Sequence, residues 1–594
     1  MKRSKKGISL VALVITIVVM IILSGAVVIT GINVPQNAQL AVFHNNIGIM
    51  QEATTTKMLN NRLKYVSERS ELYKWVDVIE GYTEESAAGG IEPTFAVNAE
   101  GKYNGQAVAA LSNVVINSTS ISEEEGSKYY VDRDGIVYHE GKDINGQIHF
   151  NQTSQTGIYG IKRKIDSSST AWERIGDSKD FKANATLYGV LSGGNDFDTL
   201  HPWSSIKSYN YNTETNKITA WYGESGYKAD GSNGDVLTYI PAFWYKRIQE
   251  DGYEYIYISS TDPKDSTYTK SEAFSIARYE TYVENNKAYS RSGVIPKVST
   301  NINTFRTITT GTDENYCLMD YRYFALQLLY LVEYADYNSQ TKLGNGFTHM
   351  RYTADDKALV AETGTNRVVV SETVGNQYIV GQQISIGTSL GSHNISNRTI
   401  TAKEAYNQDG VTGTAIYFDG ATVNISVGNV LYNSAQKTGS TDSLGMRSGT
   451  PGVAKTTGVI YRGVENIFGN TWTWVDGINI KNNEVFVCYN PANYVSSTFT
   501  GNYVSVGTMP SKEGYQKTVG YNANHPLITY PKEVGGGAST YISDYYYTNS
   551  GADRALFVGG RWNAGTLAGL WYWNTHHAPS DSWSGIGARL LKYQ

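Results

Sequence analysis

The chain has 594 residues and a formal net charge of −5. It is long enough to bury a large core, and its charge gives no reason to expect nucleic acid as a partner. The 59 glycines and 46 tyrosines, with only 18% charged residues, favour an extracellular, β-rich protein with many turns. Two cysteines, Cys317 and Cys488, exclude a disulfide-dense scaffold and leave their pairing open. We expect no metal and no cofactor, because no Cys/His ligand spacing is present.

The amino terminus has a short basic leader followed by a long apolar run. The basic residues are Lys2, Arg3, Lys5 and Lys6. The apolar run 8–29 would extend about 33 Å as a helix, which is enough to cross a bilayer. The positive-inside rule places residue 1 in the cytoplasm and the remainder outside. These features predict a single-pass protein of the cell membrane with an extracellular carboxyl-terminal domain.

This leader resembles the class III leader of type IV prepilins, in which a basic peptide and a glycine precede an apolar helix. The resemblance implies cleavage after Gly7, which leaves Ile8 as the first residue. It also implies prepilin peptidase and other pilin-like subunits as partners, and incorporation into a pilus-like structure. Family members carry Glu at the fifth mature position, where this chain has Ala12, so polymerisation stays open. A plain uncleaved signal anchor is the alternative.

The segments after the leader form a stalk and a spacer. Apolar residues at three-to-four spacing between Met58 and Leu72 predict an amphipathic helix, so residues 8–85 are interpreted as a transmembrane and stalk helix. Residues 86–156 are interpreted as a small β-rich, pilin-like head or spacer. Within it, 129–139 predicts two short strands joined by an Asp-Gly turn, rather than a calcium loop, because the late Glu ligand is missing.

Residues 157–594 alternate strand-like runs with Gly, Asn and Asp turns. One helix interrupts them, with Asp320 as its expected cap and apolar positions from Tyr323 to Tyr337, ended by Asn338 and Gly344. We expect this helix to pack an apolar face onto a sheet. A mostly β domain with one strong helix predicts the α+β class.

Six segments of this domain carry a second resemblance. They are 172–176, 197–203, 239–246, 328–346, 461–477 and 559–589. In this order they resemble the C-type-lectin-fold variable proteins of diversity-generating retroelements, a fold shared with formylglycine-generating enzymes. The resemblance implies a ligand-binding surface in a variable region at about 555–592, rewritten by a reverse transcriptase at adenines of a template. Asn, Tyr, His, Ser, Asp and Thr are typical products at such positions.

The tail supplies the candidate site. Period-two alternation in 570–577 puts Trp571, Trp573 and Thr575 toward the core and Tyr572, Asn574 and His576 toward the ligand. Four tryptophans within about two dozen residues favour a contact surface. The expected ligand-binding residues are Arg561, Asn563, Thr566, Tyr572, Asn574, His576, His577, Asp581 and Trp583.

Other residues of this domain allow more than one interpretation. Trp472, Trp474, Glu465 and Asn466 suit either a site or a framework that ties loops together, and we favour the framework. Adjacent His576 and His577 would point to opposite faces of a strand, which disfavours shared metal ligation.

The sequence predicts no enzyme. Formylglycine generation needs a cysteine pair near the carboxyl end of the domain, and residues 551–594 contain no cysteine. The expected function is therefore membrane-anchored display of a diversified binding face toward an unknown protein or glycan ligand. A minor pilin or envelope subunit with a static lectin-like domain is the alternative.

Overall fold

The computed structural model describes residues 157–593, apart from 262 and 264, and shorter stretches between 46 and 150. The chain divides into two compact units, one of residues 1–61 with 72–155 and the other of residues 62–71 with 156–594. Gly7, Ile8, the apolar run 8–29 and the amphipathic segment 58–72 lie outside the described residues.

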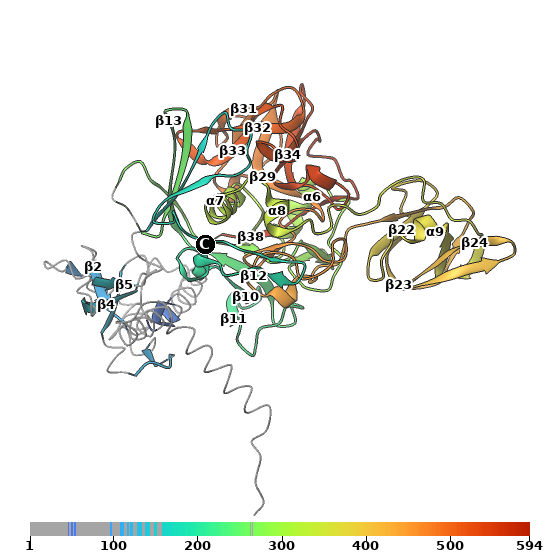
Figure 1. The fold of residues 1–594 in the computed structure, drawn as a ribbon, viewed down its shortest axis with the longest axis horizontal. Helices are drawn as coiled ribbons and strands as arrows, with labels where there is room; N and C mark the ends of the chain where they lie inside the picture. Colours follow the sequence, from blue (N-terminus) through green and yellow to red (C-terminus); the bar gives the residue numbers. More distant parts are fainter. Residues whose placement is uncertain are drawn as a thin grey trace, which may run out of the picture. The chain divides into compact units, whose positions relative to one another are not determined.

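The first unit contains a five-stranded antiparallel sheet, drawn in blue in Figure 1. Its order is β1 (Ala96–Val97), β2 (Ala107–Ala110), β3 (Tyr129–Asp132), β4 (Val137–Lys142) and β5 (Ile148–Phe150). Tyr129 pairs with His139 and Val131 with Val137. The two strands predicted across 129–139 are thereby confirmed.

The predicted membrane location needs correction. Among the residues that the structure describes, none of the helices is long and apolar enough to cross a bilayer. The single-pass arrangement with a transmembrane stalk was inferred from the basic leader, the apolar run 8–29 and the amphipathic pattern at 58–72, and these segments are not among the described residues.

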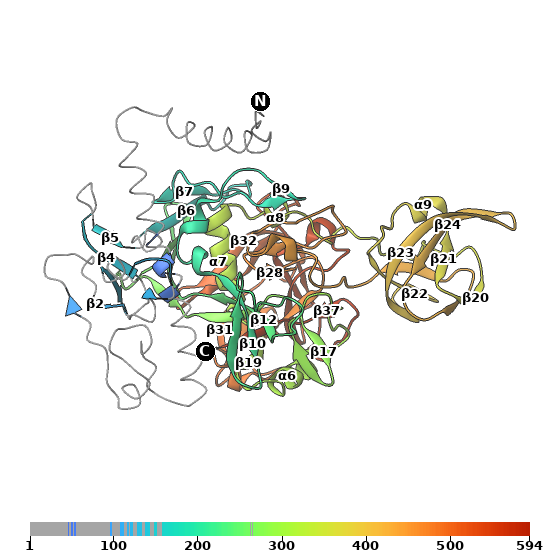
Figure 2. The same ribbon diagram turned by 90° about the horizontal axis from the view of Figure 1, so that it is seen from below.

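The second unit is built mainly from three sheets (Figures 1 and 2). The six-stranded sheet has the order β11 (Lys217–Trp221), β10 (Lys207–Asn212), β12 (Asp235–Ile240), β16 (Phe274–Ala277), β38 (Leu590–Lys592) and β19 (Tyr316–Leu318). A five-stranded sheet has the order β15 (Thr269–Ser271), β13 (Phe243–Glu250), β14 (Tyr253–Ser259), β6 (Ile158–Lys164) and β7 (Glu173–Gly176). β38 therefore brings the last residues of the chain into the interior of a sheet.

The largest sheet has nine strands and carries most of the tail. Its order is β31 (Val504–Thr508), β30 (Glu484–Val487), β29 (Trp472–Lys481), β35 (Asp553–Gly559), β36 (Gly569–Thr575), β34 (Ile542–Thr548), β32 (Gly514–Asn522) and β33 (His525–Val534), with β37 (Ile586–Gly587) parallel to β29. Three short pairs complete this part: β8 (Thr186–Leu187) with β9 (Val190–Leu191), β17 (Tyr282–Glu284) with β18 (Lys287–Tyr289), and β27 (Ile460–Tyr461) with β28 (Val464–Glu465).

Helices are few in the part of the chain that the structure describes. In the second unit they include α6 (Ile302–Thr310), α7 (Tyr323–Tyr334), α8 (Ser339–Leu343) and α9 (Glu372–Gly375), with short 3-10 turns η2 (Asp196–Thr199), η3 (Trp203–Ser205), η4 (Asp442–Leu444), η5 (Pro491–Asn493) and η6 (Gly565–Leu567). The fold class is therefore mostly β, and the predicted α+β class is wrong. The apolar pattern at 323–337 was interpreted as a helical layer that packs on one face of a sheet. The helix that forms there is instead enclosed by strands.

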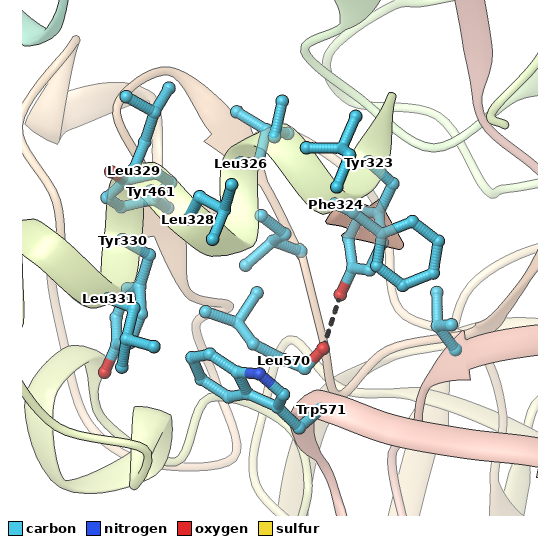
Figure 3. Close-up of a cluster of buried hydrophobic side chains, with 14 of the residues drawn as sticks. Tyr323, Phe324, Leu326, Leu328, Leu329, Tyr330, Leu331, Tyr461, Leu570 and Trp571 are labelled. Atoms are coloured by element: carbon cyan, nitrogen blue, oxygen red, sulfur yellow. Dashed lines mark hydrogen bonds between the residues drawn. The ribbon is translucent and has the colours of Figure 1, made fainter. Parts of the chain in front are cut away.

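The helix α7 is a core element with no solvent-facing side. All twelve of its residues are buried, and it contacts β33 of the nine-stranded sheet and both β14 and β6 of the five-stranded sheet. The Tyr323 hydroxyl donates to the Leu570 carbonyl at 2.9 Å (Figure 3). The expected single apolar face is thus replaced by burial on every side, which a mostly apolar helix allows. Its two buried polar side chains are partnered, Gln327 by the Leu570 carbonyl and Glu333 by Arg462.

The ends of this helix also differ from the prediction. Asp320 accepts the backbone N–H of Arg322 at 2.9 Å and does not cap the helix, whose N-cap residue is Arg322. The helix ends at the left-handed residue Ala335. Asn338 caps the separate helix α8 and Gly344 ends it.

In the chain, a small β module lies between α8 and β27. It was not predicted from the sequence, where residues 157–594 were interpreted as one domain. Its main sheet has the order β21 (Arg367–Val370), β24 (Val411–Phe418), β23 (Ile395–Gln408), β22 (Gln383–Gly387) and β26 (Val430–Asn433), and β20 (Glu362–Thr365) pairs with β25 (Val423–Ile425). The module has its own hydrophobic cluster, which includes Val368, Val370, Tyr378, Ile384, Ile386, Ile400, Ile416, Phe418 and Leu431.

Buried polar groups tie the loops of the main body together. The Glu465 carboxylate accepts the backbone N–H groups of Gly439 and Thr441 at 2.7 and 2.9 Å. Asn466 donates to Glu280 at 3.1 Å, and the Trp474 indole donates to the Thr300 carbonyl at 3.2 Å. These three residues have the framework role expected of them. Trp472 is half-buried and belongs to the surface described next.

Candidate functional site

The strand β36 separates two aromatic layers. Trp571 and Trp573 lie on its inner side, where Trp571 meets Tyr337 with 4.9 Å between ring centroids and Trp573 meets Phe324 at 5.8 Å. Tyr572 belongs to a different hydrophobic cluster, with Phe557 and the α6 residues Ile302 and Phe305. The predicted alternation is correct for the two faces of this strand.

The predicted exposure of the second face is not found for two residues. Tyr572 is 1% exposed and Asn574 is 4% exposed. The Asn574 amide donates to the Tyr572 hydroxyl at 3.1 Å, and its carbonyl oxygen accepts the backbone N–H of His576 at 3.0 Å. Alternation fixes which side a residue takes, but it does not reveal what covers that side. Tyr572 and Asn574 therefore support the surface from beneath and do not form it.

Half-buried aromatic side chains lie over this layer and form what we call the aromatic face. They are Trp472 of β29, Tyr515 of β32, and Tyr545 and Tyr547 of β34. Tyr545 lies 4.5 Å from Tyr547 and 5.2 Å from Tyr515 between ring centroids, and Tyr547 lies 6.0 Å from Tyr572. Sequence reasoning missed the three tyrosines because it looked for contact residues mainly in the tail, and it assigned Trp472 to the framework. The Tyr-x-Tyr alternation at 545–547 was an available signal.

A loop after β36 forms a polar rim beside this face. His577 Nδ1 lies 2.9 Å from Asp581 Oδ2, and the rings of His577 and Trp583 are 5.3 Å apart. Trp583 is 56% exposed, and His576 is exposed beside it. The structure thus brings together the four predicted residues His576, His577, Asp581 and Trp583, which we call the rim loop.

The electrostatics of the rim loop favour a neutral imidazole. Burial lowers the pKa of His577 from its ordinary value, and the hydrogen bond and charge of Asp581 oppose that shift. Among the described residues no group of three or more His, Cys, Asp or Glu side chains could hold a metal ion.

The segment before β36 supplies the other predicted residues. Thr566 is exposed and its hydroxyl lies 3.0 Å from the Tyr515 hydroxyl. Asn563 is half-buried, and its side-chain oxygen has no hydrogen-bond partner among the described residues. Arg561 is half-buried, with its Cζ atom 4.4 Å from the ring centroid of Trp472 and 4.8 Å from that of Tyr352.

Two glycines hold this segment in place. Gly560 has φ of 77°, and a Cβ there would lie 2.6 Å from the Ala568 Cβ. A Cβ at Gly585 would lie 2.6 Å from Arg561 Cδ and 3.4 Å from the Trp472 ring. Both positions need glycine, the first for its left-handed backbone and the second for the close approach of Arg561.

The two cysteines do not contribute to this surface. Both thiols are free and buried. Burial, followed by the charge of Asp320, raises the pKa of Cys317 well above its ordinary value, so this thiol stays protonated and unreactive at neutral pH.

The comparisons with known proteins give distant similarity only. No family model and no curated protein matches it. A solved chain named Major Tropism Determinant U1 Variant is similar to it at 13% identity with a TM-score of 0.19, over 78% of this chain and 93% of that chain. The lectin fold and the prepilin-like amino terminus are not confirmed by these comparisons.

Proposed function

We propose that this protein binds an external ligand through the aromatic face and the rim loop, and that it is not an enzyme. The observation that carries the proposal is the stack of layers at β36. Fully buried side chains form a rigid support, and half-buried tyrosines and tryptophans lie over it. Tyr and Trp give large contact area at low entropic cost, and exposed aromatic groups of this kind mark contact surfaces.

The finer part of the proposal is that a retroelement diversifies the exposed positions. Thr566, His576 and Trp583 are exposed, so their replacement leaves the buried layer intact. Tyr572 and Asn574 are buried, so we expect them to stay fixed or to vary only with compensation. We therefore expect the diversified positions to lie in the rim and not in the strand β36 beneath it.

The test of binding is a display library of the full chain. Positions 566, 576, 577, 581 and 583 are randomised and the library is selected against one purified protein such as an albumin. We expect binders whose thermal midpoints match that of the parent chain. If selected variants bind only when they have lost their cooperative unfolding transition, the surface is not a binding site. A second library at buried positions such as 571, 573 and 575 is the matched control and should yield few folded members.

The test of diversification is the neighbouring DNA. We expect a reverse transcriptase gene and a near-copy of the segment that encodes 555–592. The copy should differ from the gene mainly at adenines, in codons for the exposed positions. A neighbourhood without such a copy would reduce the proposal to a static binding surface.

A further inference from the structure

Among the described residues, the Arg561 guanidinium has neither the carboxylate partner of Arg462 and Arg351 nor the main-chain carbonyl partners of Arg589. Arg462 Nε lies 2.7 Å from Glu333 Oε2, and Arg351 Nε lies 2.7 Å from Asp356 Oδ2. Among the described residues, Arg561 has no carboxylate within 4.0 Å, although it is half-buried. An enclosed charge without a partner is costly, whereas paired charges recover part of that cost.

Aromatic rings hold this guanidinium in place. Its Cζ atom lies 4.4, 4.8 and 5.3 Å from the ring centroids of Trp472, Tyr352 and Trp562. Stacking of this kind orients the planar group. Tyr352 also shares a hydrogen bond with the guanidinium, and the remaining N–H groups have no carboxylate acceptor within 4.0 Å among the described residues. Burial lowers the pKa of Arg561 from its ordinary value, and the nearby tyrosines Tyr352 and Tyr572 oppose that shift.

A second observation at the same place points to a missing ligand. The Trp562 indole N–H is buried with no hydrogen-bond partner among the described residues, and so is the side-chain oxygen of Asn563. Trp562 itself is 0% exposed. Buried polar atoms are almost always hydrogen-bonded, so the unpartnered indole N–H beside this cation indicates an acceptor that arrives from outside. The Asn563 oxygen is itself an acceptor and would instead need a donor from the ligand.

We propose that Arg561 binds the carboxylate of an aspartate or glutamate side chain on a protein ligand. The inference rests on the proposed function and names the chemistry of its ligand. Arginine, tryptophan and tyrosine are the residues that dominate binding energy in protein–protein interfaces, and they do so in central, desolvated positions. Here Arg561 lies between the aromatic face and Tyr352, a residue outside the tail.

The probe is the peptide acetyl-Gly-Glu-Gly-amide, and its glutamine counterpart is the matched ligand control. The thermal midpoint of the full chain is measured as each peptide is added at constant ionic strength. A ligand that binds only the native state raises this midpoint in a saturable way. We expect a rise with the glutamate peptide and none with the glutamine peptide. Equal effects of the two peptides would overturn the proposal.

Variants then assign the effect to Arg561. Arg561→Gln should abolish the rise, and Arg561→Lys, which keeps the charge but loses the fork, should weaken peptide binding about tenfold. Arg367→Gln is the control, because Arg367 also stacks on Tyr406 and Tyr417 but is paired with Glu362. It should leave the response unchanged. If the glutamate peptide raises the thermal midpoints of Arg561→Lys and Arg561→Gln as much as that of the parent chain, Arg561 does not bind the carboxylate.

Two further results separate the inference from the proposed function. If N-acetylneuraminic acid raises the midpoint and the glutamate peptide does not, the ligand is an acidic sugar and the proposal of a protein ligand is wrong. If the display library yields binders with equal affinity in the Arg561→Gln background, the inference fails and the proposed function stands. If the peptide binds but the library yields no folded binders, the proposed function fails alone.

Discussion

The two faces of the nine-stranded sheet use the same residue types for opposite purposes. On the inner face, Trp571 and Trp573 pack against α7 and its neighbours and are almost fully buried. On the outer face, Trp472 and Tyr545 are only half-buried. Both sets follow the same period-two alternation. The difference therefore comes from what covers each face, and an aromatic-rich strand by itself does not indicate a binding site.

The largest expected effect is on the inner face. Trp573→Ala should lower the free energy of unfolding by about 3–5 kcal/mol, because it removes a large side chain from a closed core. Chemical denaturation of the full chain measures this. A loss below about 1 kcal/mol would mean that the inner face is loosely packed and that the comparison of the two faces is mistaken.

A smaller effect is expected in the layer beneath the aromatic face. Tyr572→Phe removes the hydroxyl that accepts a hydrogen bond from Asn574 at 3.1 Å. The Asn574 amide is then left without this acceptor, so the free energy of unfolding should fall by about 1 kcal/mol. Denaturation at one temperature measures it, with Tyr545→Phe as the half-buried control. If Tyr572→Phe is neutral and instead weakens a selected ligand, Tyr572 is a contact residue after all.

Trp583→Ala is the exposed counterpart of Trp573→Ala. Because the side chain is 56% exposed, the free energy of unfolding should change by no more than about 0.5 kcal/mol. Affinity for a ligand selected on this surface should fall at least about tenfold. Binding isotherms and denaturation on the same variant measure the two quantities. A large stability loss without an affinity loss would assign Trp583 to the framework.

The smallest effect is the pH dependence from His577. Burial lowers the pKa of this imidazole in the folded chain, so the unfolded chain binds the proton more readily. Stability from this group is therefore fully present above the unfolded pKa of about 6.5 and is lost as pH falls below that value through the lower pKa of the folded chain.

Thermal midpoints of His577→Gln and of the exposed control His576→Gln measure this contribution. The first variant should show a weaker fall toward acid pH than the parent chain. The second removes only the charge of His576, a smaller cause of the same pKa shift, so its response should lie between those of His577→Gln and the parent chain. An identical acid response in His577→Gln and the parent would contradict the assignment.

Features that depend on neighbouring residues could be predicted from the sequence. Features that depend on residues far apart in the chain could not. The hairpin in 129–139 and the alternation in β36 depend on neighbouring residues, and both are present. Asp320 matched a helix-cap pattern. Its carboxylate instead accepts a hydrogen bond at 2.7 Å from the hydroxyl of Tyr494, which is distant in the sequence. Such a partner competes with the local cap and has no local signature.

The candidate site shows the same limit. The tail residues of the rim loop lie together because they are close in sequence, and their role in binding stays a prediction. Arg561 was predicted too, but its partner rings Tyr352 and Trp472 come from other parts of the chain. Tyr352 lies next to the start of the inserted module, whose separate core was not recognised because its strands have the same composition as those around it.

The position of β38 limits which products of the proposed variation can fold. This strand pairs with both β16 and β19, so a sheet formed from residues 207–318 stays incomplete until residues 590–592 have been synthesised. A rewriting event that shifts the reading frame anywhere upstream in the tail would remove β38 and expose two unpaired strand edges. Such products would be open to proteolysis and aggregation, so only in-frame variants would reach the folded form.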